Sequence, residues 1–245
     1  MENTAELSAP THDYSYSYGP VEVQGNSIAK TVAEVRSKVA PYRFKIAARA
    51  ISRELKLEPE QKVLEIGSGL GLLGKAIKEE TDGEIKYHGI ELAYKPAKES
   101  EKEGLIETQS DTINLPYADN SFDAVVSTDV LEHIPDAQGA VKEINRVLKP
   151  GGNAFLVIAD PSEARFTNVS DHINRTGKKS NIEYWEKLFS ENSLEVSSEK
   201  SKKYRAKDWR KVFNHPFLVK LKEKPGFACA FNSVYRPGTY ILHKK

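Results

Sequence analysis

The chain has 245 residues, of which 39% are hydrophobic and 29% are charged, and its formal net charge is +1. This length and composition predict one α/β domain with additions and a sizeable core, and the near-neutral charge argues against a general nucleic-acid or membrane field while leaving room for a local patch. The single cysteine excludes an internal disulfide framework and is typical of a reducing compartment.

The N-terminal part of the chain predicts an extension ahead of the main domain. Residues 1–10 are polar and acidic, without the apolar core of a signal peptide, and no apolar run approaches the roughly 20 residues that span a bilayer. We therefore expect a cytoplasmic protein without a membrane span. Residues 1–27 are rich in Ser, Tyr, Gly and Pro and predict a flexible segment or a lid. Two helices are expected next, over residues 28–38 and from Pro41 to about Leu57.

The stretch from Val63 to Gly71 is the one around which the rest of the chain is organised. It predicts a short buried strand that runs into a glycine loop and then into a helix from Leu72 to Glu80. Glycines let the backbone turn tightly and a ligand lie against it, and the start of the helix offers free N–H groups and a positive dipole end. This unit therefore predicts a site for a nucleoside-type cofactor at the mouth of a parallel sheet.

Glu65 indicates which cofactor binds there. It lies two residues before the first glycine, at the carboxyl end of the strand, and we expect it to face the ligand. A carboxylate there would repel a pyrophosphate but suits a ligand with an ammonium and a sulfonium, which is the charge pattern of S-adenosyl-L-methionine (SAM). The spacing of Gly69, Gly71 and Gly74 also matches the dinucleotide fingerprint, so NAD stays open on this motif alone. The string Glu65-Ile-Gly67-Ser-Gly69-Leu-Gly71 resembles the first motif of the class I SAM-dependent methyltransferases.

Two acids further along the chain fit the same cofactor. Residues 85–91 predict the second strand, and Glu91 at its tip, about 20 residues beyond the glycine loop, can accept both ribose hydroxyls of SAM or of NAD. Residues 104–108 predict a short third strand. The resemblance implies that Asp111 accepts a hydrogen bond from the adenine amino group, although taken alone it would be a helix cap or a turn residue. By the same resemblance, the cofactor also contacts Gly67, Ser68, Gly69, Leu92 and Thr112.

Two longer strings resemble the methyltransferases more specifically. A fourth strand is predicted over residues 122–127, and the segment from Ser121 to His133 is similar to the subgroup called methyltransferase type 11, which acts on quinone precursors, sterols and natural products. The resemblance implies that Thr128 and Asp129 lie beside the cofactor and the substrate. The second string runs from Glu143 to Gly152. Dehydrogenases do not usually carry this pair of strings, which favours SAM over NAD.

The remaining elements complete the predicted fold. Asp136 is expected to start a helix from Ala137 to Leu148, and a turn rich in glycine then leads into a fifth strand over residues 153–158. The C-terminal part predicts a helix over residues 182–190, a strand over 194–198, and antiparallel strands over 227–234 and 240–243.

Together with the resemblance, these elements predict a Rossmann-like, seven-stranded, mostly parallel sheet with helices on both faces and an N-terminal helical or lid extension. We expect residues 28–245 to form a single methyltransferase domain. Within it, the N-terminal helices occupy residues 28–58, the SAM-binding core residues 61–160, and the substrate-side region with the C-terminal strands residues 161–245.

Two histidines are candidate general bases on the substrate side. Histidine titrates near neutral pH; His133 follows the tip of the fourth strand, and His172 lies in the loop after the fifth. Either one alternatively lines the site without moving a proton, and Asp129 either orients an acceptor or caps a turn. A divalent-cation site built from these three residues and Glu132 is a further alternative. We predict no metal, because the Leu-Glu-His string also occurs in metal-free members of the family.

The sequence therefore predicts a SAM-dependent methyltransferase that acts on an oxygen or a nitrogen of a small-molecule metabolite. One alternative is a nucleic-acid methyltransferase, because basic and aromatic residues alternate from Lys202 to Lys211. The chain lacks the Asn/Asp-Pro-Pro-aromatic string typical of enzymes that methylate exocyclic base amines. The other alternative is an inactive SAM-binding partner subunit, against which the intact cofactor motifs argue.

Overall fold

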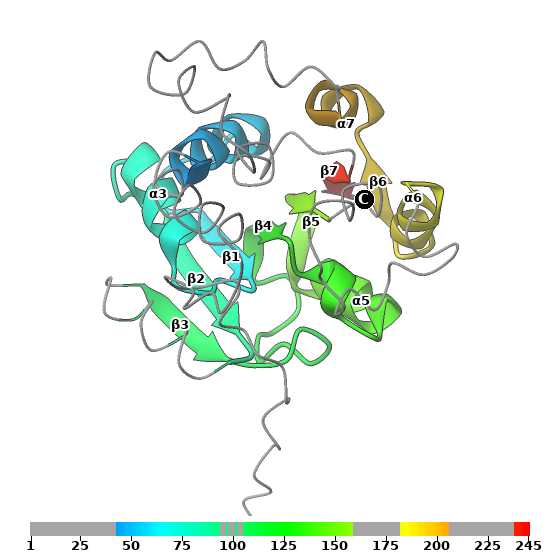
Figure 1. Ribbon diagram of the computed structural model, residues 1–245, viewed down its shortest axis with the longest axis horizontal. Helices are drawn as coiled ribbons and strands as arrows, with labels where there is room; N and C mark the ends of the chain where they lie inside the picture. The colour runs from blue at the N-terminus through cyan, green and yellow to red at the C-terminus, as the bar shows by residue number, and fades with distance from the viewer. Residues whose placement is uncertain (1–42, 94–96, 98–100, 102–104, 159–181, 206–237) are drawn as a thin grey trace, which may run out of the picture.

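The computed structural model describes residues 43–93, 97, 101, 105–158, 182–205 and 238–245 (Figure 1). Within them the chain forms a seven-stranded sheet in the order β3-β2-β1-β4-β5-β7-β6. The strands are β1 Lys62–Ile66, β2 Lys86–Glu91, β3 Ile106–Gln109, β4 Phe122–Thr128, β5 Leu148–Val157, β6 Leu194–Val196 and β7 Thr239–Lys244. Neighbouring strands pair in parallel except where β7 pairs antiparallel with β5 and with β6. The predicted mostly parallel sheet is confirmed.

Helices cover both faces of this sheet, as predicted. Helix α3 (Leu72–Glu80) and the helix over residues 43–55 lie on one face, whereas α5 (Ala137–Val147) and α6 (Ile182–Glu191) lie on the other (Figure 1). Helix α7 (Ser198–Arg205) was not predicted, and it packs near the C-terminal strand, where the Ser201 hydroxyl accepts the backbone N–H of Ile241 at 3.1 Å.

The side chains of β1 show how the sheet separates two hydrophobic layers. Leu64 and Ile66 belong to the core cluster that includes α5 and α6, whereas Val63 belongs to the cluster that includes α3 and the helix over residues 43–55. All three are fully buried, and each stabilises the fold by about 1.5–3 kcal/mol. Because side chains alternate along a strand, Glu65 shares the face of Val63, which is the α3 face.

Helix α5 begins where the sequence predicts. The Asp136 carboxylate accepts the backbone N–H of Gly139 at 2.8 Å, as an N-cap does. The buried face of the helix then follows the 3.6-residue period through Ala140, Val141, Ile144 and Val147.

The largest differences from the predicted strand boundaries are in β5, β3 and β6, and β6 ends at Val196, two residues before its predicted end. Strand β5 begins at Leu148 rather than at Asn153, because Leu148 already pairs with Phe122 and the register then shifts between Phe122 and Ala124. The glycine turn is therefore a bulge in the strand, with Gly151 at φ 78°. The third strand is Ile106–Gln109, which begins two residues and ends one residue later than predicted. The segments expected over residues 1–38 and 227–234 lie outside the described residues.

Candidate functional site

The glycine loop between β1 and α3 has a backbone that glycine favours. Gly67, Gly69 and Gly71 have φ values of 70°, 56° and 73°, in the left-handed region that side chains disfavour. The N–H groups of Gly67 and Ser68 both donate to the carbonyl oxygen of Ile90, at 2.8 and 3.0 Å, and the N–H of Gly71 donates to Ser68 at 2.9 Å. The loop is therefore bound to the carboxyl end of β2.

Glu91 holds the same loop through its side chain. The residue is buried, and its two carboxylate oxygens accept the N–H groups of Gly69 and Ala93, each at 3.0 Å. It lies at the tip of the strand next to the loop, where the sequence predicts it. A carboxylate offers about four acceptor positions, so Glu91 can hold the loop and still accept ligand hydroxyls.

Glu65 does not face the ligand side, and the orientation expected from the sequence is wrong. The side chain is buried on the α3 face of β1, where the Tyr87 hydroxyl donates to its carboxylate at 2.5 Å. The backbone N–H of Gly74 in α3 also donates to it. Burial raises the pKa of the Glu65 carboxyl to about 8, so the group is mostly protonated at neutral pH. Glu65 therefore supports the loop and the helix from behind, and its predicted place among the cofactor-binding residues stays a prediction.

The predicted adenine side of the site follows the tips of β2 and β3. The Ser110 N–H donates to Glu91 O at 3.2 Å, which joins the two tips. Asp111 is exposed, and its carboxylate accepts the N–H of Ile113 at 3.2 Å, as in an Asx-turn. Thr112 is buried, whereas Leu92 and Ile113 leave 37% and 41% of their surface exposed. A carboxylate and partly exposed apolar side chains thus lie just beyond the ends of these two strands.

The tip of β4 packs directly against the glycine loop. A Cβ atom added to Gly67 would lie 3.1 Å from Cγ1 of Val130 and closer still to its Cγ2. Gly67 therefore lets Val130 approach the loop, and this contact brings the segment from Thr128 to His133 to the cofactor side of the sheet. Both of these end residues are half-buried, and His133 lies in a short 3₁₀ helix, Leu131–His133.

Asp129 has an unusual backbone and a partner that the sequence did not reveal. Its φ of 59° is left-handed, and its N–H donates to Val157 O at 2.9 Å. Its carboxylate forms an ion pair with Arg43, at 3.5 Å, and the two side chains are 25% and 15% exposed. Arg43 belongs to the helix over residues 43–55, far away in sequence, so spacing could not have found it. This contact joins the N-terminal helix to the tip of β4.

The second family string of the sequence contacts the loop that precedes the first. The Arg146 guanidinium, in the second string, donates to the backbone carbonyls of Leu115 and Tyr117, at 3.0 and 2.6 Å, and to the Asp119 carboxylate at 2.9 Å. Glu143 accepts from the same guanidinium at 2.7 Å and from Leu115 N–H at 2.7 Å. Helix α5 therefore fixes the loop that precedes the first string.

Other expected features fall partly outside the described residues. His172 lies there, and so do residues 206–211 of the basic segment. Within the described ranges, no three His, Cys, Asp or Glu side chains gather as a metal site requires, which leaves the cation alternative untested without His172. None of the helices in that part of the chain is both long and apolar enough to span a membrane.

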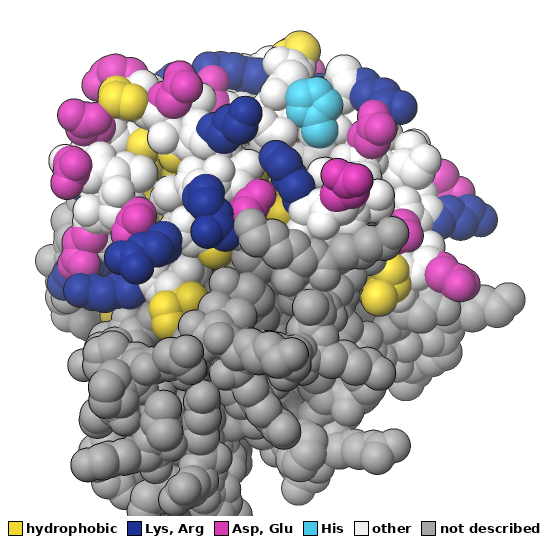
Figure 2. All heavy atoms as spheres, turned by 90° about the horizontal axis from the view of Figure 1, so that it is seen from above, with side chains coloured by type: hydrophobic (Ala, Val, Ile, Leu, Met, Phe, Trp, Pro, Cys, Tyr) yellow, Lys and Arg dark blue, Asp and Glu magenta, His cyan; other side chains and the backbone are white. Residues whose placement is uncertain are grey.

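The surface over the helix at residues 43–55 carries both signs of charge. Figure 2, seen from above the view of Figure 1, shows Lys and Arg side chains interspersed with Asp and Glu over its described part. Lys45 pairs with Glu79 and Arg49 with Glu80, each at 3.5 Å, across the groove between this helix and α3. The described part of this face therefore presents no field of a single sign that would attract nucleic acid.

Comparisons with known proteins agree with this geometry. Residues 64–156 match the model of a methyltransferase domain family, which covers the glycine loop, Glu91, Asp111 and both strings. Over this segment the chain is similar to the SAM-dependent methyltransferases. The resemblance to the type 11 subgroup is thereby confirmed.

The matches to curated relatives span only part of those proteins, between 28% and 57% of their lengths in the three that follow. The chain is 35% identical over 109 residues to sterol 24-C-methyltransferase ERG6B of Gibberella zeae, covering 42% of this chain and 28% of that protein. It is 31% identical over 148 residues to the uncharacterized methyltransferase YcgJ of Bacillus subtilis, covering 55% and 57%. It is 29% identical over 136 residues to 27-O-demethylrifamycin SV methyltransferase of Amycolatopsis mediterranei, covering 51% and 48%.

Solved structures share the fold. The YcgJ protein of Bacillus subtilis superposes with a TM-score of 0.52 at 20% identity, covering 83% of this chain and 98% of that chain. The [4+2]-cyclase SpnF superposes with a TM-score of 0.56 at 17% identity, covering 82% and 81%. Because a protein named as a cyclase shares this architecture, the fold alone does not establish the reaction.

The residues at the loop fit SAM and do not fit a dinucleotide. A pyrophosphate needs the free N–H groups of a glycine loop, but those of Gly67, Ser68, Gly69 and Gly71 already donate to acceptors within the protein. The acceptor of the Gly69 N–H is the carboxylate of Glu91, and this carboxylate would repel a phosphate. SAM, the cofactor of this family, brings a ribose and a positive charge to this place, and both suit Glu91.

Proposed function

We propose that this methyltransferase transfers the methyl group of SAM to an oxygen or a nitrogen of a small-molecule acceptor. The observation that carries the proposal is the contact of Val130 with Gly67, since it places the tip of β4 beside the loop that receives the cofactor. The segment from Thr128 to His133 then borders both the cofactor and the acceptor.

Each candidate site residue in the described part of the chain has its own role in this proposal. Glu91 accepts the ribose hydroxyls, Asp111 accepts the adenine amino group, and Leu92 covers a face of the ring. Gly67, Ser68 and Gly69 bring the backbone close to the cofactor, Thr112 supports the adenine side, and Thr128 and Asp129 border the methyl group. SAM supplies a methyl group on a positively charged sulfur, which is already activated as a leaving group. The main work left to the protein is alignment and exclusion of water.

His133 and His172 are the proposed proton acceptors. A hydroxyl or an ammonium must lose a proton when it is methylated, and a half-buried histidine near neutral pH can take it. We expect His133→Ala to lower kcat by about 10²- to 10⁴-fold, the range typical of general base catalysis, without a change in the Kd of SAM. An unchanged kcat would remove His133 from the chemistry.

The names of the relatives support a small-molecule acceptor, but they indicate different methylated atoms. They include a sterol 24-C-methyltransferase, a phosphoethanolamine N-methyltransferase of Caenorhabditis elegans, and the rifamycin methyltransferase, whose name gives an oxygen. We favour oxygen or nitrogen for this chain because a histidine lies next to the proposed methyl position. An alkene carbon provides its own electron pair and loses its proton only afterwards.

The test is to identify the acceptor directly. The purified protein is incubated with methyl-labelled SAM and a small-molecule extract of the source organism, and products that gain the label are located by mass spectrometry. Glu91→Ala serves as the control that should abolish labelling. A product labelled on oxygen or nitrogen supports the proposal. A product labelled on carbon contradicts the choice of oxygen or nitrogen as the methylated atom. Labelled RNA or DNA, or tight SAM binding without any product, overturns it.

A further inference from the structure

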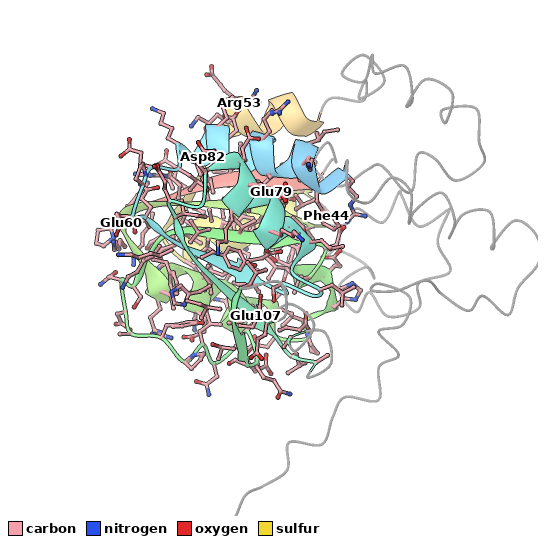
Figure 3. All side chains as sticks on the ribbon, turned by 90° about the vertical axis from the view of Figure 1, so that its left-hand side faces the viewer. Phe44, Arg53, Glu60, Glu79, Asp82 and Glu107 are labelled. Atoms are coloured by element: carbon pink, nitrogen blue, oxygen red, sulfur yellow. The ribbon has the colours of Figure 1, made fainter. Side chains whose placement is uncertain are left out.

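An acid on the outer strand β3 contacts the glycine loop, and no motif of the sequence pointed to it. Glu107 lies opposite Gly89 in the parallel register of β2 and β3, and Gly89 in turn lies opposite Glu65 of β1. Cross-strand partners point to the same face of a sheet, so both acids project on the α3 face, on either side of a glycine. Glu107 is labelled in Figure 3, which shows the molecule from the left-hand side of Figure 1.

Gly89 is what allows Glu107 to reach the loop. A Cβ atom added to Gly89 would lie 2.5 Å from Cδ of Glu107, and closer still to both carboxylate oxygens. The side chain of Glu107 therefore lies across the backbone of β2, in space that any other residue at position 89 would fill. From there its Oε2 accepts a hydrogen bond from the Ser68 hydroxyl at 2.6 Å.

Ser68 is the residue of the loop that this bond fixes. Its N–H donates to Ile90 O at 3.0 Å, and its hydroxyl also lies 3.3 Å from the same carbonyl. The bond to Glu107 is the shorter of the two and is assisted by charge. Glu91, at the end of β2, holds the next residue, Gly69. Two neighbouring strands therefore each hold one of two consecutive loop residues with a carboxylate.

We propose that Glu107 is a positioning residue for the cofactor, which holds Ser68, and through it the glycine loop, in the conformation that receives SAM. The inference rests on the proposed SAM site and adds to it a residue outside the matching motifs. Without Glu107 the Ser68 hydroxyl can turn to Ile90 O, so the loop keeps its fold and loses one of its anchors.

The test measures binding of SAM and of S-adenosylhomocysteine, whose sulfur is uncharged, by calorimetry. The variants are Glu107→Gln, Ser68→Ala and the pair combined. Glu60→Gln is the matched control, since Glu60 is an exposed acid before β1 that pairs only with the surface residue Lys86 among the contacts of the described residues. We expect each single variant to raise both dissociation constants by about tenfold, as expected for one charge-assisted hydrogen bond, and the pair to cost no more than either alone.

Four results would overturn the assignment. Unchanged dissociation constants in Glu107→Gln would show that the bond does not position the loop, and additive losses in the double variant would show that the two residues act separately. A loss confined to SAM would show that Glu107 acts through its charge on the sulfonium. Melting temperature is recorded for every variant, because a loss of binding that only follows a loss of folding also contradicts a positioning role.

The binding experiment, combined with the labelling test of the proposed function, separates this inference from that function. Wild-type protein that binds neither nucleoside refutes the cofactor site itself, and Glu107 with it. Wild-type protein that binds SAM tightly, with variants that bind equally well, refutes only the role of Glu107. Wild-type protein that binds SAM but methylates nothing, with weakened variants, supports the role of Glu107 and refutes the transferase.

Discussion

Replacing Gly67 by alanine tests the contact that joins the glycine loop to β4. The new side chain would carry two costs. The left-handed backbone, at φ 70°, disfavours an L side chain by about 1–2 kcal/mol. The Cβ would also lie 3.1 Å from Cγ1 of Val130 and closer to Cγ2, and such overpacking typically costs about 1–3 kcal/mol. We expect Gly67→Ala to lower the free energy of unfolding by about 2–5 kcal/mol, or to displace Val130 and weaken SAM binding.

Gly83→Ala is the matched control for this substitution. Gly83 has nearly the same backbone, with φ 75°, but nothing lies within 4 Å of the Cβ position. It should therefore show the backbone cost alone, about 1–2 kcal/mol, with unchanged affinity for SAM. Both variants are measured by urea denaturation and by calorimetry with SAM. Equal losses of stability together with equal affinities would refute the argument that Val130 packs on the loop and places the tip of β4 at the site.

Three further outcomes follow from single contacts. Arg146→Met removes the hydrogen bonds to the carbonyls of Leu115 and Tyr117 and should lower the free energy of unfolding by about 1–3 kcal/mol in urea denaturation, whereas Lys142→Met on the exposed side of the same helix should not. The pKa of Glu65 is raised from 4.5 to about 8, so between these pH values the folded protein keeps a proton that the unfolded chain loses. The free energy of unfolding should therefore fall as the pH rises from 4.5 to about 8, by up to about 1.4 kcal/mol per pH unit. Glu65→Gln should flatten this slope, and an equal slope in the variant would contradict the raised pKa. Glu91→Ala should weaken SAM binding at least tenfold by calorimetry, and unchanged affinity would refute the ribose contact.

The strand, loop and helix from Lys62 to Glu80 could be read from sequence because local rules agree there. A short apolar run, glycine spacing and helix propensity all indicate the same boundaries, and α3 begins and ends where predicted. The Asp136 cap set the start of α5 in the same way. The position of Glu91 also followed, since the tip of a strand next to the loop is fixed by the parallel order of β1 and β2.

The orientation of Glu65 could not be read from its place in the motif. An acid at a strand end has two faces available, and the choice depends on which neighbours fill the α3 face. Tyr87 and Gly74 supply hydrogen bonds there, so a carboxyl can be buried as the neutral form. The sequence argument assigned the repulsion of pyrophosphate to Glu65, whereas Glu91, which accepts the Gly69 N–H, occupies the place where it would act.

Contacts between distant segments were invisible for a different reason. Glu107 reaches Ser68 only because β3 lies beside β2 in register, and Arg43 reaches Asp129 only because the N-terminal helix packs near β4. Such contacts come from the tertiary fold, and neither residue lies in a motif.

The most direct test of the account is a crystal structure of the protein grown with SAM. The account predicts the nucleoside at the glycine loop, with the ribose hydroxyls within hydrogen-bond distance of the Glu91 carboxylate and the adenine amino group beside Asp111. A nucleoside bound elsewhere, or a loop that releases Glu91 to receive the pyrophosphate of a dinucleotide, would contradict it.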